Sequence, residues 1–143
     1  MPMIDLTYVR GSLDDAALAR LTDELVTVLL RAERVPDTPF MRDNTIVYVH
    51  ALDPAAQSVG GRGPGEPRFR IELTVFEGAL PRDRKEQLAA DVHAAVCGAA
   101  GIDPGGSREF YVWTLIHEIP EGSWAGGGKI IYYRRVKGLV ADD

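Results

Sequence analysis

An internal repeat limits the folds open to this chain more than any other feature of its sequence. When the sequence is shifted against itself by 67 residues, IDLTYVRGSL (Ile4 to Leu13) aligns with IELTVFEGAL (Ile71 to Leu80). The same shift aligns His50 with His117. Self-similarity at a fixed spacing indicates a structural unit that occurs more than once. The sequence therefore predicts two copies of one unit.

The two copies are expected to form a single domain, residues 1–143. They cover about residues 2–61 and 68–136, and the segment from Asp53 to Pro67, DPAAQSVGGRGPGEP, is dense in Gly and Pro. Such a composition is typical of a linker. A chain of 143 residues is of single-domain size and is long enough to bury a core.

The first copy has the pattern of a strand, a helix and a second strand. Apolar and polar residues alternate from Ile4 to Tyr8, as in a strand with one buried face. Ser12 and Asp15 are predicted to cap the helix that follows. The segment TIVYVHA, from Thr45, is apolar almost throughout, which predicts a strand covered on both faces. The apolar stripe of the helix consists of Leu18, Leu21, Leu25, Val28 and Leu29.

The second copy repeats this pattern. Residues alternate from Phe69 to Val75, Pro81 suits the first turn of a helix, and FYVWTLIH (Phe110 to His117) is the predicted closing strand. The segment KIIYYRRV, Lys129 to Val136, is also strand-like and is expected to extend the sheet or to pair with a neighbouring subunit. The apolar stripe of the second helix consists of Leu88, Val92 and Val96.

Duplicated strand–helix–strand units restrict the topology of the sheet. Within each unit the strands must be parallel and the crossover right-handed. The predicted fold class is therefore α/β (α+β), with a four-stranded sheet and two helices on one face. The other face is expected to be apolar and uncovered, which predicts oligomerisation.

Composition excludes several classes of function. A net charge of −5 gives no reason to expect nucleic acid or an anionic membrane as a partner. The sequence shows neither a bilayer-length apolar run nor a signal peptide, and its single cysteine, Cys97, fits a reducing cytoplasm and a place in the core. No zinc-type cluster, P-loop or GxGxxG loop is found, so neither a metal nor a cofactor is predicted.

Pro2 is the residue with the most distinctive chemistry. If Met1 is removed, the nitrogen of Pro2 changes from an amide into a secondary amine. The pKa of an α-amino group is ordinarily about 7.7–8.0, and burial or a nearby cation lowers it. A free Pro2 would therefore be a base near neutral pH, suited to moving a proton between carbon atoms.

These features together resemble the tautomerase superfamily: Pro2 at the start of a strand, a Gly-containing turn after it, and a tandem βαβ unit. The segment IHEIPEGSWAGGGK (Ile116 to Lys129) resembles the end of the 4-oxalocrotonate tautomerase unit. The double-length arrangement is similar to malonate semialdehyde decarboxylase and the cis-3-chloroacrylic acid dehalogenases. The resemblance implies a homotrimeric, cofactor-free isomerase (a tautomerase) that acts on a small 2-oxo or enol carboxylic acid.

The resemblance also implies site residues. Pro2 would be the general base, and arginines would bind the carboxylate of the substrate. Arg82, at the start of the second helix, is the first choice, and Arg42 and Arg10 are further candidates. Trp124 matches the aromatic residue of the pocket. Arg84 is interpreted as a solvent-exposed helix charge.

Two alternatives to a tautomerase remain open in the sequence. One is a decarboxylase, hydratase or dehalogenase on the same scaffold, in which Asp37 or Asp43 assists water. The other is a trimeric scaffold or binding protein without catalysis. His50 and His117 are interpreted as a structural pair. The sequence does not identify the substrate, because the size of the pocket depends on the loops.

Overall fold

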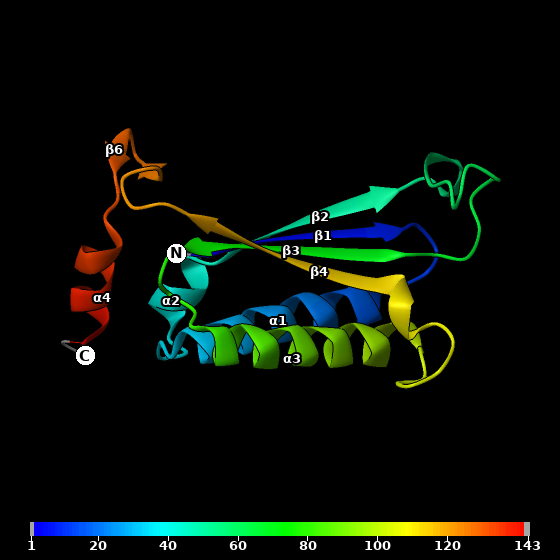
Figure 1. Cartoon of the computed structure of the whole chain (residues 1–143), viewed down its shortest axis with the longest axis horizontal. Coiled ribbons are helices and arrows are strands. Elements are labelled where there is room, and N and C mark those ends of the chain that lie inside the picture. The colour runs from blue at the N-terminus through cyan, green and yellow to red at the C-terminus, as the bar shows by residue number, and fades with distance from the viewer. Residues whose placement is uncertain (1, 142–143) are drawn as a thin grey trace.

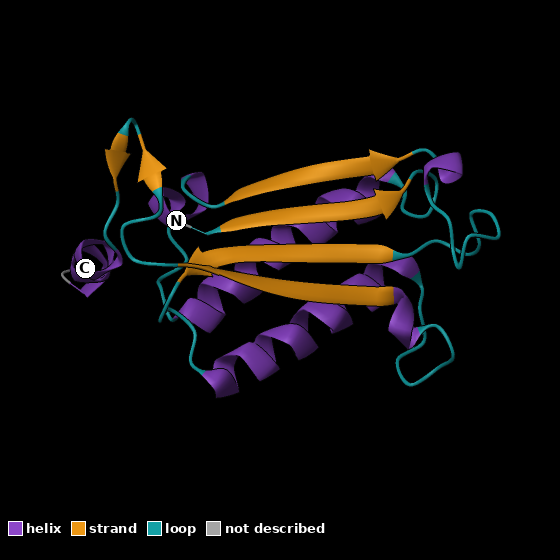
Figure 2. Cartoon of the chain, turned by 45° about the horizontal axis from the view of Figure 1, so that its top comes forward, coloured by secondary structure: helices purple, strands orange, loops and turns teal. Residues whose placement is uncertain are grey.

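The computed structural model describes residues 2–141 of the chain. A sheet forms one layer and two long helices form the other (Figures 1 and 2). The strands of the large sheet are β1 (Met3–Val9), β2 (Ile46–Leu52), β3 (Phe69–Phe76) and β4 (Val112–Ile119). The helices are α1 (Asp15–Glu33), α2 (Pro39–Asp43), α3 (Arg82–Ala100) and α4 (Tyr133–Ala141), with short 3-10 turns at Pro54–Ala56 and Glu109–Tyr111. A hairpin of β5 (Ala125–Gly126) and β6 (Lys129–Ile130) precedes α4.

The sheet has the strand order β2-β1-β3-β4. β1 pairs with β2 in parallel and β3 with β4 in parallel, whereas β1 and β3 are antiparallel. Each strand–helix–strand segment therefore contributes one parallel pair, and the two pairs meet at the centre. Both long helices cover the same face (Figure 2), as the sequence predicts.

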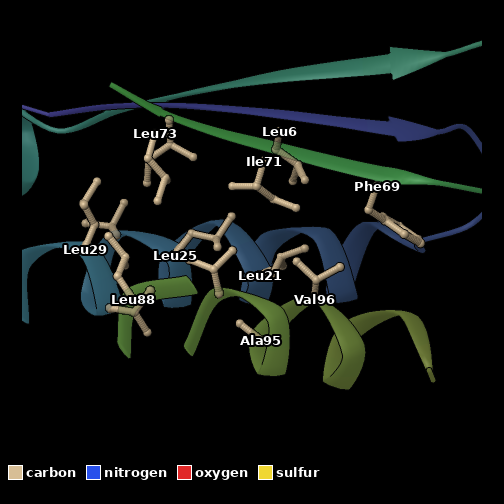
Figure 3. Packing of buried hydrophobic residues seen from close by; sticks show 14 of the residues in the cluster. Leu6, Leu21, Leu25, Leu29, Phe69, Ile71, Leu73, Leu88, Ala95 and Val96 are labelled. Atoms are coloured by element: carbon tan, nitrogen blue, oxygen red, sulfur yellow. The ribbon is translucent and has the colours of Figure 1, made fainter. Parts of the chain in front are cut away.

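The core lies between the sheet and this helix layer. The side chains of Leu6, Ile71 and Leu73 point from the sheet toward Leu25 and Leu88 on the helices (Figure 3). All five are fully or almost fully buried. The predicted helical stripes are thus the packed faces of α1 and α3, except that Leu18 is only partly buried at the edge of the core. Cys97 is also buried, as predicted.

The cap of α1 differs from the prediction. The Asp14 carboxylate accepts a hydrogen bond from the backbone N–H of Ala17 at 2.7 Å, so Asp14 is the N-cap residue. Ser12 instead donates its hydroxyl to the carbonyl oxygen of Val9 at 2.6 Å and closes the turn after β1. Asp15 is the first residue of the helix, where a negative charge favours the positive end of the helix dipole.

Two predictions about the sheet are wrong for the single chain. β2 is an edge strand, and Ile46, Tyr48 and Val49 are exposed rather than covered on both faces. The face away from α1 and α3, called the outer face below, is polar along the central strands rather than apolar. The reason is the alternation of side chains, which turns Asp5 of β1 and Glu72 of β3 away from the core.

The segment Lys129–Val136 is not a continuous strand. Only Lys129 and Ile130 pair, in the β5–β6 hairpin, and the chain then turns into α4 at Tyr133. The hairpin and α4 lie beyond one end of the large sheet (Figure 1). A strand-like composition did not decide the structure here, because the segment has no partner in the large sheet.

Candidate active site

Pro2 lies at one end of the sheet, directly before β1. It is buried, and its carbonyl oxygen accepts a hydrogen bond of 3.4 Å from the backbone N–H of Ile46. Because Met3 pairs with Thr74, the start of β1 runs beside the last residues of β3 (Figure 1). Met1, whose removal the Pro2 chemistry requires, lies outside the described residues.

A pocket of about 390 Å³ opens at the same end of the molecule. It is formed where β3 and α1 end, α3 begins and α4 passes by. Glu33 of α1, Phe76 of β3, Arg84 of α3 and Tyr133 of α4 line it. Gly78, in the turn between β3 and α3, also lines the pocket and has a φ of 84°, which favours glycine.

The aromatic rings of Phe76 and Tyr133 line this pocket and belong to a cluster of three. The ring of Phe76 lies 4.8 Å from that of Trp124 and 5.6 Å from that of Tyr133, centroid to centroid. Trp124, predicted as the aromatic residue of the pocket, therefore packs behind Phe76 and does not itself line the cavity. Together the three rings fix the hairpin and α4 against the end of β3.

The charged groups of the pocket influence one another. Arg84 donates a hydrogen bond of 2.8 Å from Nη1 to the carbonyl oxygen of Ala32, which holds its guanidinium beside the end of α1. Burial raises the pKa of the Glu33 carboxyl, and the positive charge of Arg84 partly opposes this rise. Burial also raises the pKa of the Tyr133 hydroxyl, and the negative charge of Glu33 adds to that rise. The pocket thus combines a fixed cation with two groups that favour their neutral forms.

The three arginines predicted for the site lie elsewhere in the single chain. The Arg82 side chain is 92% exposed and pairs with Glu86 at 3.0 Å. Arg10 follows β1 at the opposite end of the sheet from Pro2 and lies 4.0 Å from Asp53. Arg42, in α2, is occupied by neighbouring side chains. Their role in binding a substrate stays a prediction.

Arg42 is the most heavily paired of these arginines. Its guanidinium contacts Asp37 at 2.6 Å and Asp23 at 2.8 Å, and it donates to the Thr27 hydroxyl at 2.7 Å. The hydrogen bond to Asp37 raises the pKa of Arg42 and lowers the pKa of the Asp37 carboxyl. Asp37 therefore serves as the partner of Arg42, and Asp43 is exposed at the end of α2.

Sequence reasoning missed Glu33, Arg84 and Tyr133 as pocket residues. The sequence predicts a solvent-exposed Arg84, because no residue pattern around α3 indicates that the end of α1 lies next to it. Tyr133 fell in a segment predicted as a strand. No motif marks Glu33, since its burial comes from residues distant in the sequence.

The described part of the chain lacks both a cluster of metal-binding side chains and a helix that could span a membrane. Within residues 2–141, no group of three or more His, Cys, Asp or Glu side chains is arranged to hold a metal ion. Among the helices of these residues, none is long and apolar enough to cross a membrane.

Comparison with known proteins finds one family that part of the chain resembles. Residues 70–133 match the model of the tautomerase family, described as "Tautomerase enzyme". No curated protein sequence matches the chain.

Several solved structures share the fold. The protein Pt0534 inactivated by 2-oxo-3-pentynoate has a TM-score of 0.75 at 15% identity, and the match covers 94% of this chain and 98% of that one. Native fused 4-OT has a TM-score of 0.74 at 19% identity, with 95% and 98% covered. A member of the cis-3-chloroacrylic acid dehalogenase family has a TM-score of 0.69 at 18% identity, with 99% of both chains covered. The chain thus resembles the tautomerase family over residues 70–133 and shares, over nearly its whole length, the fold of fused 4-OT and of a cis-3-chloroacrylic acid dehalogenase family member.

Proposed function

We propose that the chain is a cofactor-free tautomerase that acts on a small 2-oxo or enol carboxylic acid, with Pro2 as the general base. The observation that carries this proposal is the position of the buried Pro2 at the same end of the sheet as a pocket that holds Arg84. Pro2 is not among the residues that line the pocket, but a base and a fixed cation at the same end of the molecule suit a substrate with a carboxylate and an acidic C–H bond. The match to the tautomerase family supports the same reading.

The chemistry needs only proton transfer. The secondary amine of Pro2 takes a proton from the carbon next to the carbonyl group, and the electron pair of that C–H bond moves into an enolate. The protonated Pro2 then returns the proton to another atom of the enolate, so no atom is gained or lost. Arg84 would bind the carboxylate and stabilise the negative charge that develops. Burial of Pro2 favours the neutral amine.

Pro2 can be tested directly. We expect the active protein to lack Met1, because the nitrogen of Pro2 is a non-basic tertiary amide while Met1 is attached. Intact mass spectrometry measures this, and ultraviolet absorbance follows the conversion of enol to keto acids. Pro2→Ala should retain the fold and lose at least about a hundredfold in kcat/KM, the usual contribution of a general base. Full activity in protein that retains Met1 would contradict the mechanism.

We also propose that the protein is a homotrimer in the cytoplasm. Similar solved structures include fused 4-OT as a symmetric trimer and as an asymmetric trimer. In the single chain, apolar side chains on both edge strands are exposed, among them Ile46 and Trp113. Exposed apolar edges need covering, and further copies of the chain would cover them. Light scattering at micromolar concentration measures the mass.

One observation favours a second candidate, a hydratase or decarboxylase on the same scaffold. Glu33 lies in the pocket, and burial raises the pKa of its carboxyl, as expected for a group that exchanges protons with water or substrate. Glu33 then takes the role predicted for Asp37 or Asp43. Release of carbon dioxide or halide during turnover would favour this candidate. Complete inactivity toward 2-oxo acids with Pro2 free would favour a non-catalytic scaffold.

A further inference from the structure

The outer face of the sheet carries two matching pairs of a histidine and a carboxylate. Nε2 of His50 lies 2.6 Å from Oδ1 of Asp5, and Nε2 of His117 lies 3.1 Å from Oε1 of Glu72. The internal repeat relates the two pairs, since Asp5 aligns with Glu72 and His50 with His117. The carboxylates are also direct neighbours, because Asp5 is opposite Glu72 in the antiparallel register of β1 and β3.

The two pairs differ in one cation. Arg70 lies 3.4 Å from the carboxylate of Glu72 and 3.5 Å from the hydroxyl of Thr7. The repeat aligns Arg70 with Met3, so the first copy has no counterpart of this arginine. Glu72 therefore has a permanent positive partner, whereas among the described residues Asp5 is balanced only when His50 is protonated.

The surroundings of this cluster leave His50 as the group that can supply the missing charge. In the described part of the chain, no element packs over the outer face, and the charged or titratable side chains that line its central hollow are Asp5, His50, Arg70, Glu72 and His117. Tyr48 of β2 is the residue opposite Asp5 and adds a hydroxyl group beside the cluster. With both imidazoles neutral, one carboxylate is unbalanced.

A second copy of the chain is the occupant that fits this face. Exposed apolar side chains on both edge strands flank the polar centre. Among them, Tyr48 of β2 is 47% exposed and Trp113 of β4 is 66% exposed. An apolar rim around hydrogen-bonded charges is suited to burial against another protein surface. The inference rests on the trimer of the proposed function, which would cover the face with further copies.

We propose that assembly of the chain through its outer face takes up one proton per copy, at the pair of His50 and Asp5. Burying an unbalanced carboxylate costs more free energy than burying a hydrogen-bonded ion pair. Imidazole titrates between about pH 5 and 8, so the trimer is most stable at the acidic end of this range and weakens as the pH rises. Three protons per trimer correspond to a fall in the association constant of up to about a thousandfold per pH unit.

Sedimentation equilibrium between pH 6 and 8.5 tests the proposal, with the full chain and four variants that each replace a titratable side chain by a neutral amide. His50→Gln should assemble with little dependence on pH, because no group remains to take up the proton. His117→Gln should keep most of the wild-type dependence, since Arg70 still balances Glu72. His93→Gln, which alters the remaining histidine on α3, should behave as the wild type. Asp5→Asn removes the unbalanced charge and should make assembly strong and independent of pH.

Calorimetry gives a second readout that does not depend on the variants. The heat of dissociation on dilution, measured in two buffers of different ionisation enthalpy, gives the number of protons released. A wild-type trimer with equal association constants at pH 6 and 8.5 would overturn the proton linkage and leave the trimer in place. Equal pH dependence in His50→Gln and the wild type would also overturn it. A monomer at every pH would overturn both the linkage and the proposed trimer.

Discussion

Arg84 of α3 donates a hydrogen bond of 2.8 Å to the carbonyl oxygen of Ala32, near the end of α1. This contact joins residues 52 positions apart and holds a guanidinium at the same end of the sheet as Pro2, which directly precedes β1. It occupies one of the five N–H donors of arginine, and within residues 2–141 no hydrogen bond engages the other four, which can bind a carboxylate.

Arg84→Ala is expected to weaken substrate binding, because the charged hydrogen bonds to the carboxylate are lost. Such bonds contribute about 1.5–3 kcal/mol, which corresponds to a rise in KM of roughly tenfold to a hundredfold. Steady-state kinetics on an enol acid measure the change. Arg82→Ala is the matched control, since Arg82 is two residues away, exposed and paired with Glu86. A larger rise in KM for Arg82→Ala than for Arg84→Ala would indicate that Arg82 binds the substrate carboxylate, and would contradict the role of Arg84.

Trp124 should report ligand binding through its fluorescence. The chain has two tryptophans, and Trp113→Phe leaves Trp124, which packs on the pocket residue Phe76. A 2-oxo acid in the pocket changes the surroundings of this aromatic cluster and should change the emission in a saturable way. The Trp124→Phe protein, in which Trp113 is the remaining fluorophore, should show no saturable change. Absence of a response in both proteins would place the ligand elsewhere.

Glu33→Gln is expected to stabilise the protein at pH 7. Because burial raises the pKa of Glu33, the folded state binds this proton more tightly than the unfolded state does. The free energy of unfolding therefore begins to fall when the pH rises above the pKa of Glu33 in the unfolded state, about 4.3. It continues to fall until the pH has passed the raised pKa of Glu33 in the folded state. The neutral amide avoids this loss. Urea unfolding should show that Glu33→Gln has a higher free energy of unfolding than the wild type at pH 7, and that the difference shrinks toward pH 4. An equal difference at pH 7 and pH 4 would show that the raised pKa of Glu33 is not its cause.

Asp14→Ala should destabilise the protein by about 1 kcal/mol, the usual cost of losing an N-cap side chain. Asp14 accepts the hydrogen bond from Ala17, whereas its neighbour Asp15 is already inside the helix. Asp15→Ala should therefore cost clearly less in the same urea titration. A reversed order would mean that the cap predicted from the sequence, with Asp15, is the correct one.

The sequence determined the elements that depend on local pattern. Alternation from Ile4 to Tyr8 and the apolar stripes of both long helices directly reflect which side chains face the core, so these elements were predicted correctly. The repeat of 67 residues also predicted two parallel strand pairs with their helices on one face. Pro2 could be predicted as the base from the sequence because its chemistry depends on its position in the chain and not on its neighbours in space, and its role stays a prediction.

Only the tertiary structure decided which residues meet. The pocket joins Glu33, Arg84 and Tyr133 from three helices, and no local pattern encodes contacts over such separations. The exposure of β2 was missed for the same reason, because no local pattern shows that an apolar strand lies at the edge of a sheet. Lys129 to Val136 became a hairpin strand and a helix because strand propensity forms a strand only where a partner strand is present. The pairing of Asp5 with His50 likewise required the register of β1 and β2, which is fixed by packing across the whole sheet.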